Sequence, residues 1–161
     1  MSKELEKGIT ENGAGFEGVV WNILGQTYYP KAVCETTFAF ETNSDPGQFV
    51  PVHVHPTQDE FILVQEGELD LKLDGVWSKA KAGDLVRMPA GIPHGYFNKS
   101  DTPARALFWV SPARKLKELF EALGSGMIKV ALNQEVPLRD AAAAHRALEA
   151  RKTVGATVLI P

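Results

Sequence analysis

Apolar and polar residues alternate in short runs along most of the chain. Between Val19 and Pro112 the runs are only a few residues long, and turn-forming residues separate each one from the next. A period of two residues is typical of strands that bury one face, so the pattern predicts a β-sandwich or barrel. The expected strands cover residues 19–24, 34–41, 49–54, 60–65, 68–73, 84–88 and 105–110.

The period of the pattern changes after Pro112. Apolar residues from Leu116 to Leu123 recur at helical spacing, and Gly124 stands where a helix is expected to end. Beyond it the pattern predicts further elements, namely a strand over 127–132, an alanine-rich helix over 137–152 and a strand over 156–160.

These patterns divide the chain into three expected parts. Residues 1–15 are polar and predict a flexible N-terminal arm. Residues 16–112 form the predicted all-β barrel, and residues 113–161 form a C-terminal extension of helices and strand.

Composition narrows the classes of partner and compartment. The 161 residues are enough for one domain with its own core. A net charge of −3 argues against nucleic acid or an anionic membrane as a partner, because both require a basic surface. No apolar run approaches the roughly 18 residues that span a bilayer, and the N-terminus does not resemble a signal peptide. Cys34 is the single cysteine, so no intrachain disulfide framework forms, and we expect a cytoplasmic protein.

Two clusters of polar residues carry the candidate chemistry. His53 and His55 are two positions apart on an expected strand, so both side chains lie on one face. Glu60 opens the return strand after a turn at Pro56, and the turn before His94 can bring that residue to the same interior. Three imidazoles and one carboxylate suit one divalent transition metal ion (Fe, Ni, Co, Mn or Zn) and leave positions open for exchange.

The spacing of both clusters resembles the two conserved motifs of the cupin superfamily. The matching positions are Gly47, His53, His55, Glu60, Gly67, Gly83, Pro89, Gly91, His94 and Asn98. The intervening segment, residues 68–82, is similar in length to the shortest spacing among microbial cupins. The resemblance implies a jelly-roll barrel with His53, His55, Glu60 and His94 on one metal ion.

Within that superfamily the chain looks most like the small, single-domain quercetin 2,3-dioxygenase-like cupins. The resemblance covers roughly residues 19–123 and depends on framework residues, so it indicates a subclass and not a substrate. The segments that carry it are Trp21-Asn22-Ile23-Leu24-Gly25, Pro46-Gly47-Gln48-Phe49-Val50-Pro51 and Val110-Ser111-Pro112.

The C-terminal 30 residues or so resemble a different family. Residues 136–161 are similar to the last helix and strand of quinone oxidoreductases of the medium-chain dehydrogenase superfamily. The nucleotide-binding domain of those enzymes has no counterpart here, so the resemblance implies no NADPH activity. Residues 13–18 match the expression G-x-G-x-x-G, but they lack the preceding strand and following helix of a dinucleotide site.

Because small barrels with exposed edges often pair, we expect a homodimer.

Apolar residues around the predicted ligands indicate a pocket for a small molecule. Phe49 and Pro51 are in phase with His53, and other candidates follow from the same alternation. The expected lining residues are Phe38, Phe40, Phe49, Pro51, Ile62, Val64 and Tyr96.

The favoured interpretation is an enzyme, a metal-dependent dioxygenase that cleaves an enolic or phenolic compound similar to a flavonol or a diketone. Its partners would be that small-molecule substrate and O2, and Glu60 would act as the catalytic general base that takes the substrate hydroxyl proton. One alternative is a non-oxidative isomerase or lyase acting on a sugar or hydroxy acid, for which Arg87 and Lys72 are the nearest cationic candidates. Another is a small-molecule-binding cupin without turnover.

Overall fold

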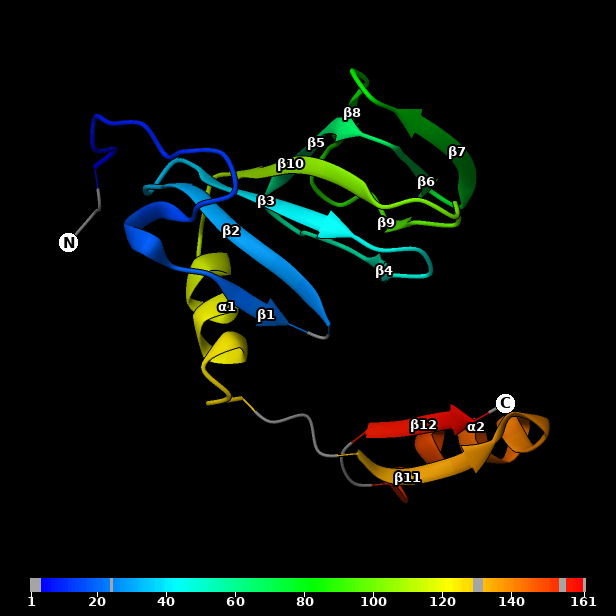
Figure 1. The fold of residues 1–161 in the computed structure, drawn as a ribbon. Coiled ribbons are helices and arrows are strands. Elements are labelled where there is room, and N and C mark those ends of the chain that lie inside the picture. The colour runs from blue at the N-terminus through cyan, green and yellow to red at the C-terminus, as the bar shows by residue number, and fades with distance from the viewer. Residues whose placement is uncertain (1–3, 24, 129–131, 154–155, 161) are drawn as a thin grey trace. The chain divides into compact units, whose positions relative to one another are not determined.

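The computed structural model describes residues 4–23, 25–128, 132–153 and 156–160 (Figure 1). The chain divides into two compact units, Met1–Ser125 and Gly126–Pro161, which are described separately below. Among the described residues, no helix has both the length and the apolar character needed to cross a bilayer.

The larger unit contains a six-stranded sheet in which every neighbouring pair is antiparallel. Strand β10 lies at its centre and pairs with β3 on one side and β5 on the other. In spatial order the strands are β1 (Trp21–Ile23), β2 (Gln26–Val33), β3 (Phe38–Ser44), β10 (Ala104–Ser111), β5 (Asp59–Glu66) and β8 (Leu85–Met88).

A four-stranded antiparallel sheet forms the second layer of this unit (Figure 1). Its strands in spatial order are β4 (Phe49–His53), β9 (His94–Phe97), β6 (Glu68–Leu73) and β7 (Val76–Lys81). The two sheets build the jelly-roll barrel that the sequence predicts. Asp74 and Gly75 form the hairpin turn that joins β6 to β7, and both residues have positive φ.

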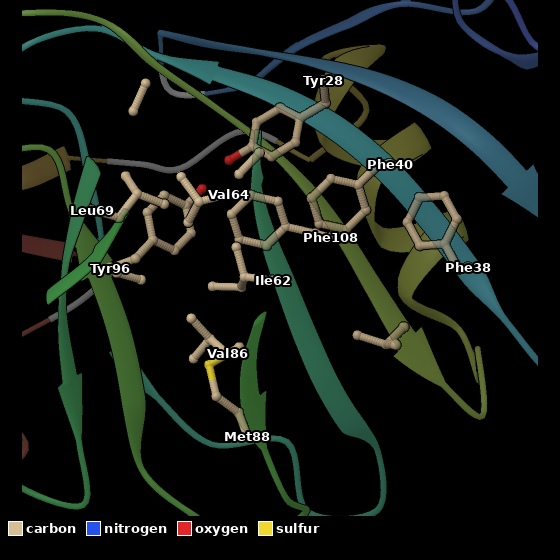
Figure 2. Close-up of a cluster of buried hydrophobic side chains, with 14 of the residues drawn as sticks. Tyr28, Phe38, Phe40, Ile62, Val64, Leu69, Val86, Met88, Tyr96 and Phe108 are labelled. Atoms are coloured by element: carbon tan, nitrogen blue, oxygen red, sulfur yellow. The ribbon is translucent and has the colours of Figure 1, made fainter. Parts of the chain in front are cut away.

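The core lies between the sheets because inward-facing residues alternate along the strands. The burial pattern of β10 alternates strictly, and its inward residues Phe108 and Val110 are buried. Figure 2 shows Phe108 between Phe40 of β3 and Ile62 of β5. The rings of Phe40 and Phe108 are stacked with centroids 5.3 Å apart.

Several strand boundaries differ from those expected. Residues 34–37 form a turn, closed by the Cys34 N–H donating to the Thr37 carbonyl oxygen, so β3 begins at Phe38 instead of Cys34. Strands β2, β7 and β9 were not expected. The expected strand over 19–24 shortens to β1, and its last residue, 24, lies outside the described residues.

A helix, α1 (Leu116–Gly124), follows β10 and packs against β1. Phe120 of this helix contacts the rings of Trp21, Tyr28, Phe38 and Phe40. We expected the C-terminal extension to begin at residue 113, whereas these contacts place the helix in the barrel unit, which ends at Ser125.

The segment expected to be a flexible arm makes specific contacts where it approaches β2. The Thr10 hydroxyl donates to the Lys31 carbonyl oxygen at 2.9 Å. The Lys31 ammonium in turn donates to the carbonyl oxygens of Glu11 and Ala14. A 3-10 turn, η1 (Phe16–Gly18), then leads towards β1, and residues 1–3 of the expected arm lie outside the described residues.

The smaller unit is a compact β-α-β arrangement. Strand β11 (Leu132–Pro137) pairs in parallel with β12 (Ala156–Ile160). A 3-10 turn, η2 (Leu138–Asp140), and helix α2 (Ala141–Glu149) connect them, as a parallel pair requires. The strand expected over 127–132 falls largely outside β11, and residues 129–131 and 154–155 lie outside the described residues.

Candidate metal centre

The barrel brings together the four residues predicted as metal ligands. His53 ends β4 and pairs directly with His94, the first residue of the neighbouring strand β9. Glu60 lies on β5 of the opposite sheet, and its side chain faces the interior with only 6% of its surface exposed. His55 follows β4 and completes the group.

The ligand atoms of these residues converge on one point. One nitrogen or carboxylate oxygen from each residue lies within 4.8 Å of the other three. The Glu60 Oε2 atom is 3.0 Å from Nε2 of both His55 and His94. The Nε2 atoms of His53 and His55 are 3.2 Å apart.

Backbone oxygens orient two of the imidazoles. Nδ1 of His53 lies 2.9 Å from the Pro51 carbonyl oxygen, and Nδ1 of His94 lies 2.8 Å from that of Ile92. Because a carbonyl oxygen only accepts, each Nδ1 carries a hydrogen, and the neutral form of each ring would then present an Nε2 lone pair inward. This is the tautomer that a metal ligand needs.

The pKa values reflect the close packing of these groups. Burial alone would raise the pKa of Glu60, but hydrogen bonds and charge from His55 and His94 outweigh it and hold the pKa at about 2. Glu60 raises the pKa of His55, with a smaller contribution from a hydrogen bond with Gln58. Burial lowers the pKa of His53 and so favours its neutral form.

The donor set fits a transition metal ion. Nitrogen and oxygen ligands bind such ions at about 2.0–2.2 Å, so two ligands of one ion lie about 3–4 Å apart. The observed separations of 3.0 and 3.2 Å between ligand atoms meet that requirement. Three imidazoles with one carboxylate suit Fe, Ni, Co, Mn or Zn and do not distinguish among them.

A cavity of about 280 Å³ opens next to this group. Three of the four candidate ligands, His53, His55 and Glu60, line it, and the rest of its wall is mainly aliphatic and aromatic. A larger hollow of about 570 Å³ lies between the N-terminal arm and β2, but no histidine lines it. The smaller cavity is therefore the one that lies beside the candidate ligands.

The structure places only some of the predicted pocket residues on the cavity wall. Phe40, Phe49, Pro51 and Tyr96 line it. The other three, Phe38, Ile62 and Val64, do not: they are almost completely buried in the core between the sheets. Alternation along a strand identifies inward residues, but it does not separate those that reach the cavity from those that pack behind it.

A bulge also changes the role expected for Phe49. The pairing of β4 with β9 shifts register between Val50 and His53, so Phe49 is not in phase with the histidines. Its ring stacks on Phe97 and the residue is 55% exposed, so it contributes only to the rim of the cavity. Val50 points inward in its place, opposite the buried Tyr96.

Sequence reasoning missed much of the cavity wall. Helix α1 supplies one side of it through Leu116, Leu119, Phe120 and Leu123. The apolar spacing predicted this helix but not the surface that it covers. Gln26 and Tyr28 of the unexpected strand β2 also line the cavity, together with Ile23, Val50 and Phe108.

The cationic side chains considered for a sugar or hydroxy-acid pocket point elsewhere. Arg87 is exposed on β8, between the buried residues Val86 and Met88. The Lys72 ammonium lies 5.6 Å from the centre of the Trp77 ring, and Trp77 is itself 48% exposed. No lysine or arginine of the described residues lines the cavity.

Comparison with known proteins places the barrel in a recognised family. Residues 40–110, which include all four candidate ligands, match the family model described as "Cupin domain". The chain is 36% identical over 67 residues to polyketide synthase CurC of Streptomyces cyaneus, a match that covers 42% of this chain and 44% of that protein. It is 46% identical over 50 residues to quercetin 2,3-dioxygenase of Bacillus subtilis, covering 31% and 15% of the two chains.

A separate match concerns a different enzyme. A stretch of 46 residues is 52% identical to quinone oxidoreductase 1 of Escherichia coli, covering 27% of this chain and 14% of that enzyme. In each of these comparisons the chain spans less than half the length of the curated relative.

Solved structures share the barrel. The protein TT1209 from Thermus thermophilus is 30% identical with a TM-score of 0.52, and the match covers 54% of this chain and 83% of that one. An RmlC-like cupin from Shewanella frigidimarina has a TM-score of 0.56, covering 67% of this chain and 97% of that one. Its sequence identity of 24% supports a common fold alone.

Proposed function

The chain belongs to the cupin superfamily, and on that premise we propose that it is a metal-dependent dioxygenase acting on an enolic or phenolic small molecule. The observation that carries the proposal is the convergence of His53, His55, Glu60 and His94 beside an apolar cavity. The partial similarity to a quercetin 2,3-dioxygenase supports the same reaction class.

Different residues of the site would bind the metal ion, accept a proton and exclude water. A divalent transition ion held by the three histidines and Glu60 would act as a Lewis acid and offer open positions to a substrate oxygen and O2. Glu60 is the only carboxylate among the described residues of the cavity wall, so it is the group available to take the proton of a substrate hydroxyl. The apolar wall would exclude water from the reacting oxygen atoms.

The cavity wall supports an apolar, aromatic substrate over a sugar. Its volume of about 280 Å³ is near the lower limit for small-molecule pockets, so a compound of one to three rings or a short diketone is the expected size. Aromatic rings from Phe40, Phe108 and Phe120 lie around it. A sugar or hydroxy acid would need several polar or cationic partners, and Arg87 and Lys72 do not supply them.

Metal analysis combined with oxygen consumption tests this proposal. The purified protein should contain about one transition metal ion per chain, and removal of the ion should abolish O2 uptake with a flavonol or a 1,3-diketone. Substrate consumption in the absence of O2 would instead favour the non-oxidative alternative. A metal-loaded protein that binds these compounds but never consumes them would favour a binding role without turnover.

The assembly is also a proposal. We propose a homodimer, because the barrel leaves strands β1 and β8 at the edges of its larger sheet and β4 and β7 at the edges of the smaller one. Light scattering of the purified full-length chain measures the molar mass directly, and a value near the 17.6 kDa of one chain would contradict a dimer.

A further inference from the structure

Gln26, at the start of β2, is a buried amide that the metal chemistry does not use. Only 3% of its surface is exposed, and it lines the same cavity as His53, His55 and Glu60. A polar side chain in such an apolar wall is costly unless its hydrogen bonds are satisfied.

Two tyrosines hold one end of this amide. The Tyr28 hydroxyl donates to Gln26 Oε1 at 2.8 Å, and the Tyr96 hydroxyl donates to the same oxygen at 2.9 Å. Tyr28 belongs to the six-stranded sheet and Tyr96 to the four-stranded sheet, so the amide is fixed from both layers. Figure 2 shows the two tyrosines within the buried cluster beside Phe40 and Phe108.

The other end of the amide has no hydrogen-bond acceptor among the described residues. Both lone pairs of Oε1 are occupied, whereas neither hydrogen of Nε2 is donated to any described group. The Nε2 atom is also not among the fully enclosed polar atoms, so it retains accessible surface, and Gln26 is one of the residues that line the cavity. The Nε2 group is therefore free to donate to an oxygen atom of a bound ligand.

The remaining polar groups on the wall leave Gln26 with a distinct role. His53, His55 and Glu60 face the point of metal binding, and the two tyrosine hydroxyls are committed to Oε1. The Nε2 group is therefore the neutral donor that the described wall offers to a ligand. A neutral amide suits a carbonyl oxygen, because a carboxylate in a cavity without lysine or arginine would remain uncompensated.

We propose that Gln26 selects the substrate by donating a hydrogen bond from Nε2 to a carbonyl oxygen, while a neighbouring hydroxyl or enol oxygen of the same molecule is directed to the metal centre. The substrate class is thereby narrowed to α-hydroxyketones, such as flavonols, and enolised diketones. This inference deepens the proposed function and relies on it for the position of the hydroxyl oxygen. It concerns binding, so it can be tested without turnover.

Anaerobic titration of the metal-loaded protein with two related probes provides the test. Quercetin carries a carbonyl beside its hydroxyl, whereas catechin has the same ring hydroxyls and no carbonyl. In Gln26→Met the side chain keeps a similar length and has no hydrogen to donate. We expect this variant to bind quercetin at least about tenfold more weakly and catechin within about twofold of the wild-type value.

Two further variants distinguish the loss of the Nε2 donor from a folding defect. Gln26→Leu also removes the donor and should show the same selective loss, while Gln65→Leu, on β5 and outside the lining of this cavity, should change quercetin binding by less than about threefold. Metal content and melting temperature verify that each variant is folded. Equal losses for both probes, or quercetin affinity unchanged in both Gln26 variants, would overturn the inference.

The outcome separates this inference from the proposed function. Selective quercetin binding without O2 uptake by the wild-type protein would support the role of Gln26 and contradict the oxygenase. O2 uptake with quercetin, combined with unchanged affinity in the Gln26 variants, would support the oxygenase and contradict the role of Gln26.

Discussion

Glu60 is the residue on which the structure and the proposed chemistry depend most directly. Its Oε2 atom lies 3.0 Å from a nitrogen of both His55 and His94, and its side chain is buried on β5. Without a metal ion the carboxylate holds these imidazoles together. With one, it would be both a ligand and the nearest proton acceptor.

Replacing Glu60 by Gln separates these two roles. Three histidines remain to hold the ion, so Glu60→Gln should retain metal with reduced affinity. The amide cannot accept the substrate proton, so kcat should fall by about 100-fold or more. Metal analysis and O2 uptake on the same sample measure both quantities. Glu66→Gln, on the exposed end of β5, serves as the matched control and should leave both unchanged.

Stability of the metal-free protein should depend on pH through the same residue. The pKa of Glu60 is lowered from 4.5 to about 2, so its stabilising contribution is present above pH 4.5 and is lost as the pH falls towards 2. The pKa of His55 is raised above 6.5, so its contribution is present below pH 6.5 and is lost as the pH rises through the raised value. Stability from this pair is therefore expected to be greatest between about pH 4.5 and 6.5.

Denaturant titrations of the metal-free protein from pH 2 to pH 9 measure this effect. The pair should contribute up to about 3 kcal/mol to the free energy of unfolding. Burial lowers the pKa of His53, which acts in the opposite direction below pH 6.5, so the comparison with Glu60→Gln isolates the pair. Parallel pH profiles for the wild type and this variant would show that the pairing contributes no stability.

The four candidate ligands were predictable because the alternation of side chains along a strand and the positions of turns depend on the nearby sequence. His53 and His55 needed only a period of two, and Glu60 needed only a turn at Pro56. The cavity wall was less predictable. The bulge between Val50 and His53 reverses the phase of β4, and its local signal, Pro51, does not distinguish a bulge from an ordinary edge strand.

At the scale of elements, strands with regular alternation were easier to predict than short or polar ones. Strand β9 has four residues, and its glycine, Gly95, lies against the backbone of Val50 and Pro51, where a side chain would clash. Strand β2 contains Pro30 and Lys31, which weaken its apolar pattern. Strand β9 acquires its conformation from pairing with β4 and β6, which are distant in sequence, whereas β2 pairs with its sequence neighbours β1 and β3.

Gly124, at the end of α1, is needed for close packing and not for the helix-terminating conformation that was expected. Gly124 was expected as a helix terminator, but it is the last residue of the helix and is not among the residues with positive φ. A Cβ atom added there would lie 2.6 Å from the Trp21 ring. The glycine is therefore required by the close approach of α1 to β1.

Gly124→Ala tests this explanation. The added methyl group should force the helix or the indole to shift and lower the free energy of unfolding by about 1–3 kcal/mol. Gly8→Ala is the control, because a Cβ atom at Gly8 meets nothing within 4 Å. Thermal and denaturant unfolding compare the two variants with the wild type. A Gly124→Ala protein as stable as the wild type would show that the helix and Trp21 adjust to the added methyl group without loss of stability.

At the scale of the whole molecule, the site and the C-terminal segment belong to different compact units. Every candidate ligand and every described residue that lines the neighbouring cavity lies before Ser125. The buried hydrophobic cluster of the described residues ends at Ala113, with Leu116, Phe120 and Leu123 packed against it. The barrel with α1 therefore contains the contacts of the described residues that position the candidate metal centre.

Removal of residues 126–161 should accordingly leave the metal centre intact. A chain ending at Ser125 keeps α1 and its aromatic contacts, so it should bind the same metal ion with the same stoichiometry and melt within about 5 °C of the full-length chain. A chain ending at Pro112 is the informative comparison, because it loses α1 and one wall of the cavity. It should be strongly destabilised. Loss of metal binding in the chain ending at Ser125 would show that the C-terminal unit is needed to maintain the site. Light scattering of the same sample would show whether that unit determines the oligomeric state.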